Sequence, residues 1–151
     1  MKKIRLHLGI FITLLVLSGI TAFPILHEID FLYDHRAVFL PVLEQWICDL
    51  YVLLHKTSPV VLYGTDWLAF AHIIIALFFL PLLIDPTRYR LNLRAGMFAC
   101  LLVFPLAFIC GPARGIPFFH QLIDCSFGLI GFLYLFFIDR LIKKYRYETT
   151  Q

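Results

Sequence analysis

The sequence has little charge for its length. Of its 151 residues 15% are Asp, Glu, Lys or Arg and 61% are hydrophobic, whereas about a quarter of a soluble domain is charged. This balance is typical of an integral membrane protein and excludes an ordinary soluble domain. The basic residues form no block that would suit nucleic acid, so we expect no nucleic-acid partner.

Paired cysteines are also lacking. The four cysteines show neither C-x-x-C spacing nor the density of a disulfide scaffold. Most lie in apolar segments, where a thiol packs as a small hydrophobe. A disulfide between Cys48 and Cys110 is an alternative for which nothing in the sequence argues. We expect no cofactor and no metal ion.

The sequence is rich in long apolar runs. A helix needs about 20 residues to cross about 30 Å of hydrocarbon. Four runs near this length are bounded by charges or by Pro and Gly, and we expect them to be the spans of a single membrane domain covering residues 1–151. They are residues 6–26, 67–84, 95–111 and 116–138. We expect the first to be an uncleaved anchor, because Ile20 stands where a signal-peptide cleavage site needs a small residue.

The positions of the basic residues predict the orientation. Ten of the 13 Lys and Arg residues precede the first span, separate the second from the third, or follow the fourth. By the positive-inside rule these segments face the cytoplasm. We therefore expect a multi-pass protein of the bacterial cytoplasmic (inner) membrane with its N- and C-termini in the cytoplasm.

The long loop after the first span contains an amphipathic helix, expected over residues 41–56. Pro41 is at its first position, His55 and Lys56 are in its last turn, and Thr-Ser-Pro59 follows. Its apolar face predicts that it lies in the outer interface or caps the bundle. A lipid-sensing or partner-binding role is the alternative. Residues 145–151 are expected to form a short frayed tail.

Ionisable residues inside the expected spans gather toward the outer side. His120 lies about 6 Å and Asp124 about 12 Å into the fourth span, and His72 lies about 9 Å past Asp66 in the second. Such groups are costly in a span and are candidates for a functional site. Small residues lie on the same helix faces as these polar residues and allow close approach. The faces of the second and fourth spans can therefore meet in a buried polar cluster open toward Asp66 and Arg114.

Three interpretations of this cluster stay open. His120 and Asp124, four residues apart, can pair and fix helix packing. The cluster can also be a catalytic or transport site, or bind a metal ion. As candidate site residues we take His120, Asp124 and His72 for catalysis and Arg114 and Asp66 for substrate binding.

A motif in this region has a known parallel. Arg114 is followed by five residues, His120, three residues and Asp124, which resembles the third signature of the phosphatidic-acid-phosphatase superfamily. The resemblance implies that His120 attacks phosphorus, Asp124 orients it and Arg114 binds phosphate, with His72 as the candidate acid for the leaving group. Ala113 stands where that family has serine, and its other two signatures are not in this chain.

A second resemblance covers more of the chain. Asp66 and His72 open the second span, and the segment from Arg114 through Asp124 to Gly131 opens the fourth. This arrangement is similar to that of small four-span proteins of the VanZ-like family, which implies size and topology but no defined activity. The overall character also resembles that of small membrane proteins of Bacteroidetes.

The sequence therefore predicts an all-α polytopic membrane protein with four transmembrane helices and an amphipathic outer interfacial helix. The leading functional hypothesis is a non-enzymatic or accessory protein whose polar cluster organises the bundle or binds a lipid or partner from the outer leaflet. The alternative is a lipid-phosphate or lipid-pyrophosphate hydrolase at Arg114, His120 and Asp124. Membrane lipids are the expected partners, with a membrane-protein partner or a homo-oligomer left open.

Overall fold

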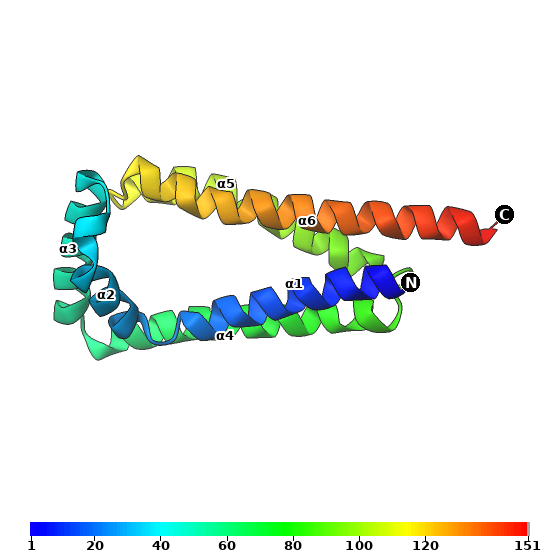
Figure 1. The fold of residues 1–151 in the computed structure, drawn as a ribbon, viewed down its shortest axis with the longest axis horizontal. Coiled ribbons are helices and arrows are strands. Elements are labelled where there is room, and N and C mark those ends of the chain that lie inside the picture. Colours follow the sequence, from blue (N-terminus) through cyan, green and yellow to red (C-terminus); the bar gives the residue numbers. More distant parts are fainter. Residues whose placement is uncertain (151) are drawn as a thin grey trace. The chain divides into compact units, whose positions relative to one another are not determined.

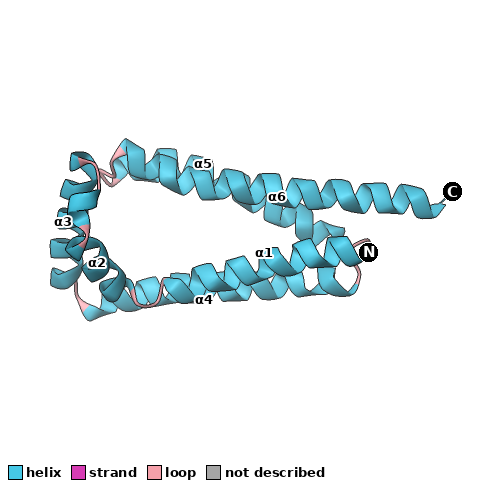
Figure 2. Cartoon of the chain, in the orientation of Figure 1, coloured by secondary structure: helices cyan, strands magenta, loops and turns pink. Residues whose placement is uncertain are grey.

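The computed structural model describes residues 1–150, with side chains as far as Glu148, and its regular elements are all helices (Figures 1 and 2). Four of them, α1, α4, α5 and α6, are long and apolar enough to cross a membrane. The all-helical class and the number of long apolar helices agree with the prediction. The elements are α1 Lys2–Thr21, α2 Ile25–Asp34, the 3-10 helix η1 Arg36–Val38, α3 Pro41–Lys56, α4 Pro59–Ile84, α5 Arg90–Ala113 and α6 Phe118–Thr150.

Proline sets two of the helix bounds that differ from the expected ones. The first long helix ends at Thr21, because Pro24 lacks an N–H and disfavours a helical residue before it. A separate helix, α2, then begins at Ile25 instead of a loop. The second long helix begins at Pro59 rather than at residue 67, since proline is favoured in a first helical turn.

The last two helices are longer than expected. The third long helix covers Arg90–Ala113 instead of residues 95–111, and the fourth covers Phe118–Thr150 instead of residues 116–138. The prediction of a frayed tail is wrong for residues 145–150, which continue α6, while Gln151 lies outside the described residues. An ion pair of 3.9 Å between Lys144 and Glu148, one turn apart, supports this last part of the helix.

The chain divides into two compact units, Met1–Ile12 with Phe78–Gln151 and Thr13–Leu77. In the first unit, the beginning of α1 packs beside the end of α4 and the later part of α6. Arg5 donates a hydrogen bond to the carbonyl of Ile84 (2.8 Å), and His7 Nδ1 lies 3.0 Å from the hydroxyl of Tyr134. The fully buried side chains of this unit include Leu8, Leu82, Leu93, Leu135, Ile138 and Ile142.

Helices α5 and α6 approach each other closely at glycines of α6. A Cβ atom on Gly128 would lie 2.8 Å from the carbonyl oxygen of Cys100, and one on Gly131 would lie 3.0 Å from its Sγ. At these two glycines the small-residue face of α6 is therefore occupied by α5. All four cysteines, including Cys48 and Cys110, are free thiols.

In the second unit α1 packs on α4 at another glycine. A Cβ on Gly19 would lie 2.7 Å from the carbonyl oxygen of Ala69 and 3.1 Å from Cβ of His72. The small-residue face of α4 thus accepts α1.

Helices α2 and α3 pack together in the second unit. The rings of Tyr33 and Tyr51 stack with centroids 4.1 Å apart, and His55 Nε2 lies 3.2 Å from Asp30 Oδ1. Helix α3 has the bounds Pro41–Lys56 expected from the sequence. On its apolar face Ile47 is buried.

The connection between α4 and α5 is organised by Asp85. Its Oδ1 accepts hydrogen bonds from the hydroxyl of Thr87 (2.6 Å) and from the backbone N–H groups of Thr87 (2.9 Å) and Arg88 (3.0 Å). These hydrogen bonds hold the pKa of Asp85 below its usual value, and the bond from the Thr87 hydroxyl has the largest effect. The carboxylate thereby shapes the turn that leads into α5.

Candidate functional site

A helix C-cap followed by a proline places the polar residues at the start of α6. Gly115 has φ of +69°, and the N–H of Ile116 donates to the carbonyl of Gly111 (2.9 Å). This is a Schellman cap, in which glycine is favoured because the left-handed conformation strains other residues. The carbonyl of Pro117 then accepts the N–H of His120 (3.0 Å) and starts α6. The sharp turn brings the first turns of α6 back onto the last turns of α5.

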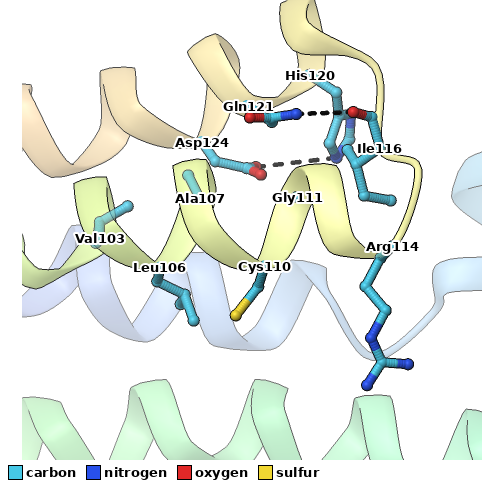
Figure 3. A pocket seen from close by; sticks show the side chains of 10 residues that line it. All are labelled: Val103, Leu106, Ala107, Cys110, Gly111, Arg114, Ile116, His120, Gln121 and Asp124. Atoms are coloured by element: carbon cyan, nitrogen blue, oxygen red, sulfur yellow. Dashed lines mark hydrogen bonds and ion pairs between the residues drawn. The ribbon is translucent and has the colours of Figure 1, made fainter.

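A pocket of about 340 Å³ is formed by these turns of α5 and α6 (Figure 3). Its polar lining includes Arg114, His120, Gln121 and Asp124. The other lining residues are apolar or small, with Val103 and Leu106 among them. Three of the five residues chosen from the sequence thus line one cavity, and the fourth polar side chain, Gln121, is new.

His120 and Asp124 face each other across one helical turn. His120 Nε2 lies 3.9 Å from Asp124 Oδ1, and both side chains are more than a third exposed. The two atoms are too far apart for a hydrogen bond, so the pair is an ion pair only when the imidazole is protonated. A partly exposed pair of this kind contributes little to stability and leaves the carboxylate able to accept hydrogen bonds from a ligand.

Gln121 is the buried polar residue of the pocket. Only 4% of it is exposed, and its Nε2 donates to the carbonyl of Ile116 (2.8 Å). This bond sets the orientation of the amide. Its Oε1 is buried and has no hydrogen-bond partner among the described residues, and Figure 3 shows this oxygen on the side of Asp124. A buried acceptor without a partner costs about 1–3 kcal/mol.

Gly111 makes room for this amide. A Cβ atom at position 111 would lie 2.6 Å from Cδ of Gln121. The side chain of Gln121 is therefore confined between the last turns of α5 and the first turn of α6. Gly111 thus serves the cap and the pocket at the same time.

Arg114 lies at the rim of the pocket. It is exposed, and in Figure 3 its guanidinium extends away from His120 and Asp124. Among the residues that line the pocket, it is the only Lys or Arg. The described residues also contain no group of three or more His, Cys, Asp or Glu placed to hold a metal ion.

The other two candidate residues, His72 and Asp66, lie on α4 in the second unit. His72 Nδ1 is 2.9 Å from the carbonyl of Leu68, one turn earlier in its own helix. Asp66 lines a separate pocket of about 190 Å³ with Phe23, Tyr63, Trp67 and Phe70. A single site that includes all five residues chosen from the sequence stays a prediction.

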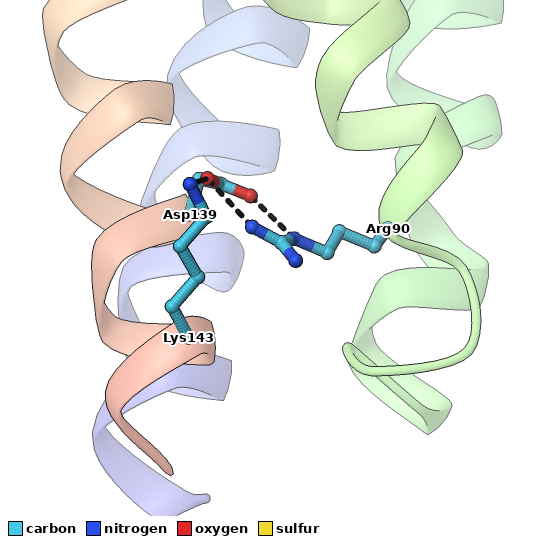
Figure 4. Close-up of polar contacts among 3 residues, drawn as sticks. All are labelled: Arg90, Asp139 and Lys143. Carbon is cyan, nitrogen blue, oxygen red and sulfur yellow. Dashed lines mark hydrogen bonds and ion pairs between the residues drawn. The ribbon is translucent and has the colours of Figure 1, made fainter. Parts of the chain in front are cut away.

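Two polar features were missed from the sequence. Gln121 is next to His120 in the chain but about 100° further round the helix, on the side that meets Gly111. Asp139 is 5% exposed and accepts two hydrogen bonds from Arg90, one of 2.8 Å from a terminal nitrogen, while Lys143 lies 3.2 Å away (Figure 4). The only sequence signal for this pair was an acidic residue close to the basic residues that follow the fourth span.

Comparisons with known proteins give no relative from which a function could be transferred. No protein-family model, no curated protein and no solved structure matches the chain.

Proposed function

We propose that the protein spans the bacterial cytoplasmic membrane with α1, α4, α5 and α6, has both termini in the cytoplasm and carries α3 in the outer interface. Supporting this, four helices have the length and hydropathy of spans. Contacts inside the first unit also bring the basic segments together: Arg5 bonds to Ile84 at the end of α4, and Arg90 bonds to Asp139, one turn before Lys143 in α6. Basic residues gathered at one end of a bundle fit the positive-inside rule.

Within that membrane the chain would act as an accessory, non-enzymatic protein that binds the headgroup of an outer-leaflet lipid in the pocket between α5 and α6. The observation that carries this proposal is the buried Oε1 of Gln121, which has no hydrogen-bond partner among the described residues and belongs to a side chain that lines a pocket of about 340 Å³. The cavity is within the usual range of about 300–1,000 Å³ for small-molecule sites. A ligand that donates to Oε1 would remove the cost of this unpaired acceptor.

The lining favours one kind of headgroup. Gln121 Oε1 and the Asp124 carboxylate are both acceptors, so the ligand should present N–H or O–H donors. The guanidinium of Arg114, at the rim, is suited to the phosphate of the same lipid. Val103 and Leu106 offer an apolar wall to the first methylene groups of its chains. A phospholipid with a primary ammonium headgroup combines these features.

The hydrolase alternative has less support. His120 and Asp124 do line the pocket, but Arg114 is the only Lys or Arg in its lining and extends away from them in Figure 3. Phosphoryl transfer depends on cations that stabilise the charge of the transferred group. A site with one remote guanidinium is better suited to binding than to turnover.

The experiment compares two lipids that differ in N–H donors. The purified protein is placed in nanodiscs containing phosphatidylethanolamine or phosphatidylcholine, and retained lipid is measured by native mass spectrometry. We expect phosphatidylethanolamine to be retained preferentially, because its ammonium can donate to Gln121 and Asp124. Gln121→Met and Asp124→Asn should each reduce this preference at least about tenfold, or about 1.4 kcal/mol.

Ser126→Ala is the matched control, since Ser126 is exposed on the same helix and its hydroxyl donates to the carbonyl of Ile123 (2.6 Å). It should behave as the wild type does. Equal retention of both lipids, or a preference unchanged in both site variants, would reject the proposal. Release of inorganic phosphate from phosphatidic acid by the wild type and not by His120→Ala would establish the hydrolase instead.

A further inference from the structure

Charge is divided unequally between the two compact units. The unit Met1–Ile12 with Phe78–Gln151 contains 11 of the 13 Lys and Arg residues and four of the ten Asp and Glu residues, a formal charge of +7. The unit Thr13–Leu77 contains the other two basic and six acidic residues, a formal charge of −4. The modest net charge of +3 is thus the sum of one strongly basic and one acidic unit.

The basic residues of the first unit gather at one end of its helices. Arg5 bonds to the last carbonyl of α4, which joins the first turns of α1 to the end of α4. Arg90 and Lys143 both reach the carboxylate of Asp139, which joins the start of α5 to the later part of α6 (Figure 4). Apart from Arg114, every basic residue of the unit lies on these segments or on the connection between α4 and α5. Positive charge therefore accumulates at this end.

Four of these cations are exposed and have no acidic partner in the described part of the chain. Lys2, Lys3, Arg94 and Arg140 form no ion pair with the described carboxylates. The first turn of α1 also contains no acidic residue, and the helix dipole adds partial positive charge there. Arg140 holds its guanidinium 4.9 Å from the ring centroid of Phe136, one turn earlier. The charge at this end is therefore suited to an external anion.

Arg94 and Arg140 lie among exposed apolar side chains. Leu91 precedes Arg94 by three residues and Phe98 follows it by four, so both share its face of α5, and both are exposed. Phe137 precedes Arg140 by three residues on α6 and is also exposed. Exposed apolar faces on helices long enough to cross a membrane are suited to contact with lipid. The two guanidiniums are thus placed where a lipid, rather than a soluble anion, is the nearest partner.

The ion pair of Arg90 and Asp139 shows that both guanidiniums belong to one level of the unit. Helices α5 and α6 are antiparallel, since the end of α5 meets the start of α6 and its start meets the later part of α6. Arg94 follows Arg90 by about 6 Å along α5. Phe136, beside the Arg140 guanidinium, precedes Asp139 by about 4.5 Å in the same direction. Both cations therefore lie about one helical turn from the ion pair, toward the apolar part of the helices.

We propose that Arg94 and Arg140 bind the phosphates of anionic phospholipids at the basic end of this unit. A guanidinium pairs bidentately with phosphate, and the apolar side chains around it contact the acyl chains of the same lipid. The surrounding cations attract a headgroup of net negative charge and repel the ammonium of a zwitterionic one. The inference rests on the membrane insertion proposed above, but not on its direction and not on the pocket formed by the turns of α5 and α6.

The test measures which lipid the protein surface selects. The full-length protein is reconstituted in phosphatidylcholine bilayers with a trace of spin-labelled phosphatidylglycerol or spin-labelled phosphatidylcholine, and electron paramagnetic resonance gives the fraction of each label that the protein immobilises. We expect phosphatidylglycerol to be favoured at least about twofold at low salt. Most of this preference should be lost in about 1 M salt, because the Debye length falls from about 10 Å at 0.1 M to about 3 Å.

Arg94→Gln combined with Arg140→Gln should remove at least about half of the preference, since the other cations remain. Arg94→Lys combined with Arg140→Lys keeps the charge and should retain more of it. The matched control is Arg36→Gln combined with Lys56→Gln, which removes the two basic residues of the acidic unit and should leave the preference unchanged. Thermal unfolding of each variant in detergent establishes that it is folded.

The proposal is overturned if the wild type immobilises both lipids equally, if high salt leaves the preference intact, or if the glutamine variant and the control lose it to the same extent. A protein that immobilises neither lipid is not inserted, which would reject the four spans together with this inference. The proposed binding at Gln121 is judged separately, by the retention of phosphatidylethanolamine.

Discussion

At the scale of single residues, the absence of a side chain is what permits helix contact. Gly128 is the clearest case, because the atom nearest to its missing Cβ is the backbone oxygen of Cys100 at 2.8 Å. A backbone carbonyl cannot rotate away as a side chain can. Any substitution at this position must therefore move α5 away from α6.

Gly128→Ala is expected to lower the free energy of unfolding by about 1–3 kcal/mol, the usual cost of overpacking. The measurement is thermal or denaturant-induced unfolding in detergent. Gly9→Ala is the control, since no other described part of the chain lies within 4 Å of the position of its Cβ and alanine is favoured over glycine in a helix by about 1 kcal/mol. Equal loss of stability in both variants would contradict the close packing of α5 on α6.

At the scale of helices, the buried ion pair of Arg90 and Asp139 links α5 to α6. Asp139 is almost fully buried, Arg90 is mostly buried and holds it with two hydrogen bonds, and Lys143 reaches the same carboxylate from a half-exposed position. Removing one partner of a buried pair strands the other charge. The planar guanidinium of Arg90 can donate two parallel hydrogen bonds to the Asp139 carboxylate, whereas the ammonium of Lys143 acts as a point charge.

Asp139→Ala should therefore destabilise the protein by about 3 kcal/mol, the lower end of the range for a broken buried pair, measured by unfolding in detergent. Lys143→Gln should cost no more than about 1 kcal/mol because its ammonium is half exposed. The double variant Arg90→Met with Asp139→Leu should recover most of the loss. If Asp139→Ala and Lys143→Gln cost the same, the pair does not fasten the two helices.

The helices also show where sequence patterns succeed and fail. The bounds of α3 follow from Pro41 at its first position and from residues 57–59 after its end, which are local signals. Helix α2 has no such signal apart from Pro24, and it is stabilised by contacts with α3 such as the stack of Tyr33 on Tyr51. These contacts depend on residues about 18 positions apart, which periodicity within one segment does not report.

At the scale of the whole molecule, the proposed topology places the connection between α3 and α4 outside and that between α4 and α5 inside. In a background without the four native cysteines, Lys56→Cys should react with a membrane-impermeant maleimide from outside the cell. Arg88→Cys should react only after the membrane is opened. Arg88 is chosen over Arg90, because Arg88 is exposed and Arg90 is held by Asp139.

Lys144→Cys provides a second position expected on the cytoplasmic side, since Lys144 is well exposed on the last part of α6. Labelling of positions 56 and 88 from the same side would refute the four-span topology. Labelling of positions 88 and 144 from opposite sides would refute the assignment of both segments to the cytoplasm. Each result is independent of what the pocket between α5 and α6 binds.

The candidate site was only partly predictable. Arg114, His120 and Asp124 are within eleven consecutive residues, so a helix beginning near Pro117 was enough to bring them near one pocket. Gln121 was missed because its burial depends on Gly111 of α5, and an exposed glutamine would have looked the same in the sequence. Asp66 was chosen for its charge, whereas its aromatic surroundings include Phe23 from a different helix connection.

By itself the sequence determined the helical class, the number of long apolar helices and the bounds of α3, because hydropathy, charge and proline act within a single segment. Only the tertiary structure decided that α5 covers the glycine face of α6, that Gln121 keeps a buried acceptor without a partner among the described residues, and that Arg90 holds Asp139. The reason is physical: burial and pairing are properties of two surfaces in contact. A pattern along one helix specifies only one of those surfaces.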